Sequence, residues 1–240
     1  MKKKRINYQD YSSGRVLYGM SGATNFSVRI SNEIFEWCDK YFTSKGKTAP
    51  YIIYDPFCGI AYSLTELGFL HGSKIKYIVG SDIDEKSLEF AKKNLSLLTY
   101  KGIDNRIEEL QKFINQYNRE SHKEALDSAK RLKAIINPNI NIEIFQFNIL
   151  NNMIFSKDVI DIDLVITDVP YGELTKWQGI EKDSKNPIQI FLDKLKTILS
   201  KDSLVVIVLN KKQIISYAGY NKIKILNRGT RKIIILETIF

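Results

Sequence analysis

The stretch Thr167-Asp168-Val169-Pro170-Tyr171-Gly172 follows directly on the apolar run 162–166. That run has the composition of a buried parallel strand. The acid, the proline and the aromatic residue therefore stand where the chain leaves the sheet, and open α/β sheets bind their ligands at that edge. A carboxylate beside a stiff turn and an aromatic ring can hold a flat base by hydrogen bonding and stacking. The motif thus predicts an α/β fold with a site at this strand end.

The composition is that of a folded chain with a basic surface. Of 240 residues, 44% are hydrophobic and 26% charged, which is ordinary for a globular protein. We expect a single domain over 1–240, with an N-terminal arm and helix in 1–48 and a helical insertion at about 102–137. Lys and Arg number 36 against 27 acids, a formal charge of +9. This balance favours a polyanionic partner, although a basic solvated surface explains it equally well.

Other classes of protein find little support in the sequence. Cys38 and Cys58 are the only cysteines and lie far apart, so neither a disulfide framework nor a metal site is expected. No apolar run reaches about 18 residues, and the basic start at 1–5 is followed by polar residues rather than a signal-peptide core. We therefore expect a cytoplasmic monomer that binds neither metal nor membrane.

Strands and helices alternate along most of the chain. Seven strands are expected, at 51–55, 76–81, 140–147, 162–167, 204–209, 223–226 and 232–237, of which the last two can pair as a hairpin. Helices are expected from near Ser31, over 62–70, over 86–98 and from Pro187 through Leu199. The insertion predicts two helices split near 118–122, whose mixed charges favour a solvated surface over an RNA platform. Residues 1–28 predict an arm and loop outside the core.

The first two strands each end in an acid. Asp55-Pro56-Phe57-Cys58-Gly59 links the first strand to a helix, and Gly59 lets the backbone approach a ligand closely. A pyrophosphate loop would carry several glycines and no acid, so a positively charged ligand without phosphates fits this turn better. Asp82 ends the second strand at the position where α/β folds place a carboxylate on ribose hydroxyls. Asp84 is better explained as the N-cap of the following helix.

These features, with an antiparallel final pair of strands, resemble the class I S-adenosylmethionine-dependent methyltransferase fold. Further blocks extend the resemblance, namely Gly14-Arg15-Val16-Leu17, Val28-Arg29, Gly80-Ser81-Asp82-Ile83-Asp84, Ala91-Lys92-Lys93-Asn94-Leu95 and 167–173 with Trp177. Together they resemble the avilamycin-resistance rRNA guanine methyltransferases of the AviRa type over most of residues 14–240. The DPxCG loop alone is shared by many nucleic-acid methyltransferases, whereas its combination with DVPYGE and Trp177 is much more specific.

The resemblance implies a Rossmann-like fold and S-adenosylmethionine as the cofactor. Asp55 would lie near the methionine end, Gly59 would admit the backbone, and Asp82 would hold the ribose. Ile83 would pack on the adenine. Asn148 stands where the family usually has an acid and would address the adenine amine through its side-chain oxygen. Ala61 replaces the second glycine of the usual CGxG loop, and it is small enough to fit unless that position needs a positive φ.

The same resemblance implies the substrate half of the site. Asp168 would accept a proton from the target base or polarise its N–H, and Tyr171 would stack on the base. Pro170, Trp177 and Arg29 complete the substrate-binding set. Trp177 is equally well explained as cover for a core edge. Arg15 and Arg29 are further candidates for a phosphate or the cofactor carboxylate.

The function implied is methylation of a guanine base in large-subunit (23S-type) ribosomal RNA, with resistance to orthosomycins such as avilamycin. Two alternatives stay open. One is methylation of an exocyclic amine on another rRNA or tRNA purine, because an acid-x-Pro-Tyr turn serves that reaction too. The other is a non-catalytic RNA-binding member of the fold, which intact Asp55, Gly59, Asp82 and Asp168 disfavour. No cysteine accompanies 167–172, which argues against covalent pyrimidine methylation.

Overall fold

The computed structural model describes residues 8–23, 27–150, 161–169, 187–213 and 215–239. The chain divides into two compact units. The first comprises 1–48, 59–74 and 86–140, and the second comprises 49–58, 75–85 and 141–240. A single domain over 1–240 stays a prediction.

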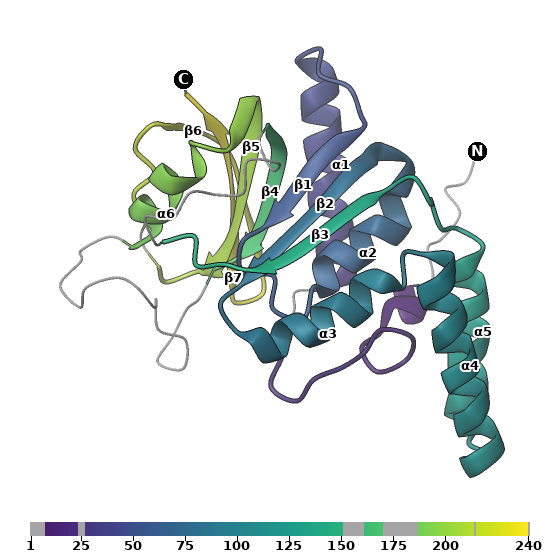
Figure 1. Cartoon of the computed structure of the whole chain (residues 1–240). Coiled ribbons are helices and arrows are strands. Elements are labelled where there is room, and N and C mark those ends of the chain that lie inside the picture. The colour runs from purple at the N-terminus through teal and green to yellow at the C-terminus, as the bar shows by residue number, and fades with distance from the viewer. Residues whose placement is uncertain (1–7, 24–26, 151–160, 170–186, 214, 240) are drawn as a thin grey trace. The chain divides into compact units, whose positions relative to one another are not determined.

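The second unit contains a seven-stranded sheet (Figure 1). Its strands are β1 (Tyr51–Asp55), β2 (Ile75–Asp82), β3 (Asn141–Gln146), β4 (Ile162–Asp168), β5 (Leu199–Asn210), β6 (Tyr220–Arg228) and β7 (Arg231–Thr238). They are ordered β3-β2-β1-β4-β5-β7-β6. β1 to β5 are parallel, and β7 pairs antiparallel with both β5 and β6. The predicted mostly parallel sheet with an antiparallel last strand is confirmed.

The strand order places three acids at one edge of the sheet. β1 lies between β2 and β4, and the chain passes from β1 to β2 on one side before returning to β4 on the other. This reversal is the topological switch point at which open α/β sheets bind ligands. Because the three strands are parallel, Asp55, Asp82 and Asp168 end them in the same direction.

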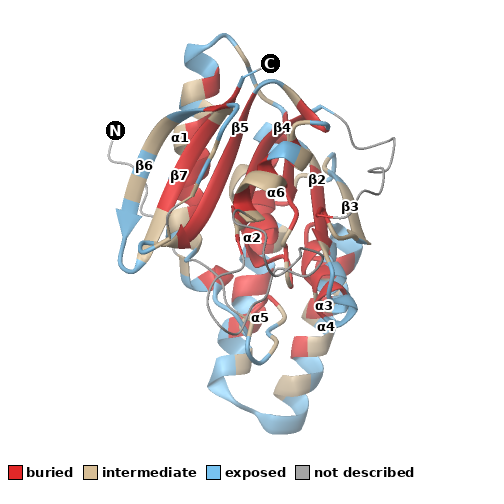
Figure 2. Cartoon of the chain, turned by 90° about the vertical axis from the view of Figure 1, so that its left-hand side faces the viewer, coloured by how far each residue is buried: buried red, intermediate tan, exposed pale blue. Residues whose placement is uncertain are grey.

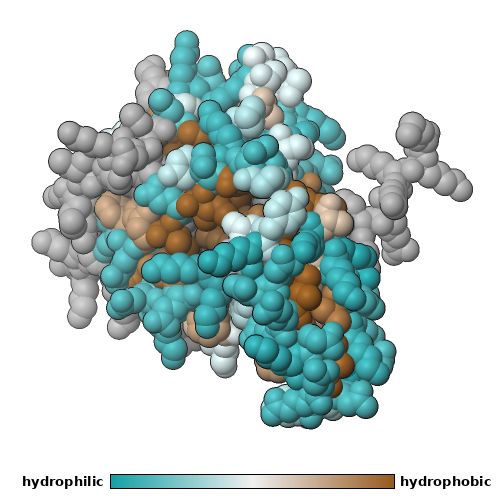
Figure 3. Space-filling view, turned by 45° about the vertical axis from the view of Figure 1, so that its right-hand side comes forward, coloured by the Kyte–Doolittle hydropathy of each residue, from teal (hydrophilic) through white to brown (hydrophobic). Residues whose placement is uncertain are grey.

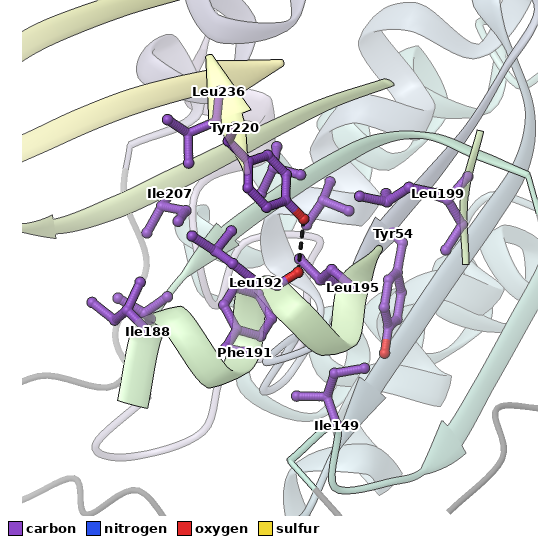
Figure 4. Packing of buried hydrophobic residues seen from close by; sticks show 14 of the residues in the cluster. Tyr54, Ile149, Ile188, Phe191, Leu192, Leu195, Leu199, Ile207, Tyr220 and Leu236 are labelled. Carbon is purple, nitrogen blue, oxygen red and sulfur yellow. Dashed lines mark hydrogen bonds between the residues drawn. The ribbon is translucent and has the colours of Figure 1, made fainter. Parts of the chain in front are cut away.

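The core of this unit lies between the sheet and helix α6 (Pro187–Leu195). Ile188, Phe191, Leu192 and Leu195 of α6 lie among apolar side chains of the strands (Figure 4). The Tyr220 hydroxyl donates to the Leu192 carbonyl at 2.7 Å, which ties β6 to the helix. Burial is deepest in the central strands, whereas β6 is largely exposed (Figure 2).

Helix α6 is shorter than the sequence predicts. The apolar spacing continues through Ile198 and Leu199, but the helix ends at Leu195. The Ile198 carbonyl accepts from the Ile162 amide at 3.0 Å, and Leu199 pairs with Ile162 as the first residue of β5. Pairing with β4 therefore satisfies backbone groups that the helical pattern alone would have placed in another turn.

Substitution of Phe191 tests how much this core contributes to stability. Its side chain is fully buried and its ring centroid lies 5.2 Å from that of Phe57. We expect Phe191→Ala to lower the free energy of unfolding by about 3–5 kcal/mol, because the removed ring leaves a cavity. Ile225→Ala, at a position 43% exposed, should cost no more than about 1 kcal/mol. Urea denaturation of both variants measures the difference, and equal losses would contradict the packing described.

The first unit is helical. It contains α1 (Val28–Ser44), α2 (Tyr62–His71), α3 (Glu85–Ser96), α4 (Tyr100–Tyr117) and α5 (Glu120–Lys133), with short 3-10 turns at Tyr8–Tyr11 and Gly72–Lys74. α4 and α5 form the predicted two-helix insertion, and they meet at Asn118, which ends α4 in the left-handed conformation. Hydrophilic side chains cover this hairpin on either side of an apolar seam (Figure 3).

The N-terminal segment is not the detached arm that its sequence suggests. Val16 and Leu17 are fully buried, although the segment lacks periodicity. Asp10 accepts hydrogen bonds from Arg131 and Ser128 of α5, and the Arg131 guanidinium holds the pKa of that carboxyl below its usual value. Arg15 donates to Ser128 at 2.8 Å and pairs with Glu124. Contacts with the insertion, which sequence periodicity does not reveal, therefore fix the segment.

Candidate active site

The turn after β1 holds Asp55 in a buried position. Only 6% of this residue is exposed. Its Oδ1 accepts from the Thr167 hydroxyl at 2.6 Å and from the Phe57 amide at 3.1 Å. Thr167 belongs to the neighbouring strand β4, so two adjacent strands fix the orientation of the carboxyl. Such fixed orientation is what a group that must face a cationic ligand requires.

Burial dominates the electrostatics of Asp55. It raises the pKa of this carboxyl to about 7, although the hydrogen bonds from Thr167 and Phe57 oppose the rise. The negative charges of Asp82 and Asp168 raise the pKa further, because like charges disfavour ionisation. Asp82 and Asp168 therefore both act on Asp55, and a cation placed beside the Asp55 carboxyl would relieve that repulsion.

The loop beyond Asp55 is fixed to β2. The Cys58 amide donates to the Ser81 carbonyl at 3.0 Å, and the Tyr54 and Ser81 hydroxyls lie 2.7 Å apart. Burial and the nearby carboxylates raise the pKa of the Cys58 thiol well above its ordinary value. The thiol stays protonated at neutral pH, so Cys58 is not the thiolate that a nucleophile would need to be.

Two residues of this loop have left-handed backbone. Gly59, next in the chain after Cys58, has φ of +52°, and an added Cβ would meet no atom within 4 Å. Glycine is therefore favoured here by the backbone conformation rather than by crowding. Ala61 has φ of +57° and caps α2. The sequence expectation is that alanine fits unless this position needs a positive φ. The position does adopt that φ, which glycine tolerates better, so alanine carries a backbone cost here.

The end of β2 carries the residues assigned to the nucleoside. Asp82 is half-buried, and its Oδ1 accepts from the Asp84 amide at 3.0 Å. Ile83 is 36% exposed, and its carbonyl accepts from Gln146 of β3 at 2.9 Å. Asn148 follows β3 and accepts from the Leu150 amide at 3.0 Å. The structure thus places all three residues at the carboxyl ends of the neighbouring strands β2 and β3.

The two carboxylate oxygens of Asp168, at the end of β4, differ in their hydrogen bonding. Oδ2 accepts a hydrogen bond from Arg231, and the two groups form an ion pair. Oδ1 is buried and has no hydrogen-bond partner among the described residues. Burial raises the pKa of Asp168, and the Arg231 guanidinium opposes that rise. An unpaired buried acceptor costs free energy, which a donor N–H from a bound base would recover.

Four further residues are predicted for the site from the sequence. Pro170, Tyr171 and Trp177 lie outside the described residues. Arg29 is exposed on α1, where its guanidinium carbon lies 5.7 Å from the Tyr8 ring centroid. Its proposed contact with the substrate stays a prediction.

Thr167 and Arg231 are the functional contacts that sequence reasoning missed. Thr167 stands inside the quoted motif, and a hydroxyl one residue before a strand-end acid is a detectable signal. Arg231 has no such signal, because it meets Asp168 through the antiparallel pairing of β7 with β5. Within the described ranges, no helix has the length and apolarity needed to cross a membrane, and no three His, Cys, Asp or Glu side chains gather as a metal would require.

Known proteins share this architecture. A family model described as rRNA methyltransferase AviRa matches residues 1–231. A 23S rRNA (guanine(2535)-N(1))-methyltransferase from Streptomyces viridochromogenes is 30% identical, over 98% of this chain and 93% of the relative. The 1.5 Å structure of AviRa from that organism has a TM-score of 0.85 at 28% identity, covering 98% of this chain and 94% of its own. The chain therefore belongs to the AviRa family of ribosomal RNA methyltransferases.

Proposed function

We propose that this chain transfers a methyl group from S-adenosylmethionine to a guanine of large-subunit ribosomal RNA. The observation that carries the proposal is the set of Asp55, Asp82 and Asp168 at the ends of three adjacent parallel strands. The relative from Streptomyces, whose name specifies guanine N1 of 23S rRNA, supports the substrate. Resistance to orthosomycin antibiotics such as avilamycin is the expected consequence in a cell.

The residues present fit this cofactor. S-adenosylmethionine carries two cationic centres and a ribose, and when bound it supplies an electrophilic methyl group. Asp55 offers a buried carboxyl whose ionised form a neighbouring cation would stabilise. Asp82 offers carboxylate oxygens suited to the ribose hydroxyls, with Ile83 and Asn148 beside it for the adenine. Gly59 leaves its Cβ position open for a close backbone approach.

Asp168 provides the substrate half. A guanine N1 must lose its proton when it takes up the methyl group. Oδ1 of Asp168 is a buried acceptor without a partner among the described residues, so it suits the N–H of a base. Arg231 holds the other oxygen and fixes the plane of the carboxylate. We infer that Asp168 takes or polarises the guanine proton while Arg231 orients it.

Transfer of labelled methyl to protein-free 23S rRNA, followed by nucleoside mass spectrometry, tests the proposal. We expect N1-methylguanosine as the product. A methyl group on an exocyclic amine would instead identify the alternative chemistry. Failure of the chain to bind S-adenosylmethionine in calorimetry would contradict the enzymatic function and favour a non-catalytic RNA-binding protein.

A pair of variants separates the cofactor carboxylate from its neighbour. Asp82→Ala should weaken S-adenosylmethionine binding about 10- to 100-fold, because hydrogen bonds to a charged group contribute about 1.5–3 kcal/mol. Asp84→Ala, two positions on, should leave that affinity unchanged and lower stability by about 1 kcal/mol if it caps α3. Calorimetry and thermal melts measure the two effects, and equal affinities in both variants would exclude Asp82 from the ribose site.

A further inference from the structure

Nearly all charged side chains in the C-terminal part of the chain are positive. From Ser203 to Leu236 the sequence contains no Asp or Glu, but it contains seven cations: Lys211, Lys212, Lys222, Lys224, Arg228, Arg231 and Lys232. This segment therefore contributes +7 to a chain whose formal charge is +9. The basic character of the protein is concentrated in β5, β6, β7 and their connections.

Five of these cations gather at one end of the sheet, and we refer to Lys211, Lys212, Arg228, Arg231 and Lys232 as the basic rim. Strand pairing brings them together, because Arg228 pairs with Arg231, Arg231 with Asn210, and Lys232 with Leu209. The Lys211 amide donates to the Thr230 carbonyl at 3.0 Å, which joins the end of β5 to the β6–β7 turn. Asp168 lies at the same end of the sheet as the rim, since it pairs with Val208.

Two members of the rim are fixed by the protein itself. Arg231 pairs with Asp168, and Lys232 donates to the Gln213 carbonyl. Lys211, Lys212 and Arg228 are exposed, and no ion pair joins either lysine to a carboxylate in the described part of the chain. Two arginines directly opposite one another on paired strands repel. The positive charges of the rim therefore repel one another, and a bound polyanion would relieve that repulsion.

We propose that the basic rim binds the phosphate backbone of the RNA next to the base that Asp168 addresses. This inference rests on the proposed function, and it adds where the RNA lies on the second unit. Lys and Arg side chains that neutralise phosphates release condensed counterions, which is the main source of affinity for nucleic acid. The ion pair between Arg231 and Asp168 places the rim beside the catalytic carboxylate. A nucleotide whose base reaches Asp168 therefore has its own phosphates close to the rim.

Neutralising the exposed cations tests the proposal. The triple variant Lys211→Gln, Lys212→Gln and Arg228→Gln removes three charges from the rim. The matched control is Lys201→Gln, Lys222→Gln and Lys224→Gln, which removes three charges from other positions of β5 and β6. Binding of protein-free 23S rRNA is measured between 50 and 300 mM KCl, about the range over which phosphate contacts dominate the salt response, and S-adenosylmethionine binding is measured by calorimetry.

The rim variant should bind the RNA at least about tenfold more weakly, and its plot of log affinity against log salt should be shallower by about 2. Its affinity for S-adenosylmethionine should be unchanged, and the control variant should behave as wild type. A rim variant with wild-type RNA affinity and salt dependence would overturn the proposal. A rim variant that loses activity on assembled ribosomal subunits but keeps it on protein-free RNA would also overturn the proposal, because the rim would then bind a protein partner. Wild-type chain that binds RNA but transfers no methyl would contradict the proposed function alone.

Discussion

Asp168→Asn is expected to lower methyl transfer to rRNA by about 10²–10⁴-fold, the usual contribution of a general acid or base. The amide keeps the size of the side chain and an oxygen acceptor, but it cannot take up the guanine proton. Single-turnover transfer with saturating cofactor and RNA measures the chemical step directly. Cofactor affinity should be unchanged, because the residues assigned to the cofactor lie at the ends of β1, β2 and β3 or in the segments that follow them, and not on β4.

The Arg231→Gln variant tests whether Asp168 acts through its ionised carboxylate or only through packing. The Arg231 guanidinium lowers the pKa of Asp168, so its removal should raise that pKa. Ionised Asp168 would then require a higher pH, and the acidic limb of the pH–rate profile should move to higher pH. In Asp168→Asn that limb should disappear, with or without Arg231→Gln. An Asp168→Asn variant with wild-type single-turnover rates would exclude Asp168 as the proton acceptor.

The sequence predicts those parts of the fold that local pattern determines. Continuous apolar runs identify β4 and β5, and acids that follow such runs mark the carboxyl edge at Asp55, Asp82 and Asp168. The parallel register then brings the three acids together without further information. The end of α6 shows the limit of this reasoning, since Ile198 and Leu199 satisfy a helical period and a strand equally well. Only their partners in β4 decide between the two.

Contacts between distant segments could not be predicted in the same way. Arg231 meets Asp168 because of the register between antiparallel β5 and β7, which no local pattern specifies. Asp10 and Arg131 form an ion pair across 121 positions of sequence, and their segments show no shared periodicity. The usual CGxG loop raised the question of a positive φ at Ala61, but alanine itself gives no sign of which backbone conformation it adopts.

Asp55→Asn is expected to weaken S-adenosylmethionine binding about 10- to 100-fold at pH 8, the scale of a lost charge-assisted hydrogen bond. Its neutral amide can still accept from Thr167 and Phe57, as Oδ1 of the carboxyl does. The variant should therefore fold normally. Calorimetry at pH 8 provides the comparison, and Asp163→Asn is the matched control. Asp163 is also buried on β4, but it accepts from the Ile52 amide, which does not belong to the cofactor set.

The same substitution should change the pH dependence of stability. Burial raises the pKa of Asp55 from 3.8 to about 7 in the folded chain, so between those pH values the folded state binds more protons than the unfolded state. Stability therefore falls as the pH rises from about 4 through 7, by on the order of a few kcal/mol. Asparagine does not titrate, so Asp55→Asn should be more stable than wild type at pH 8 and similar to it near pH 4. Urea denaturation across this range measures the difference.

Cofactor affinity should show the opposite trend with pH, because a cation prefers the ionised form of Asp55. Wild-type affinity should rise as the pH increases through 7, and Asp55→Asn should lack that rise. The cofactor's own groups titrate equally with both proteins, so the ratio of the two affinities isolates Asp55. A ratio that stays constant from pH 5.5 to 8.5, a range that spans the pKa of about 7, would show that the carboxyl does not meet the cationic part of the cofactor. Asp55 would then serve only to fix the turn after β1 to the neighbouring strand β4 through Thr167.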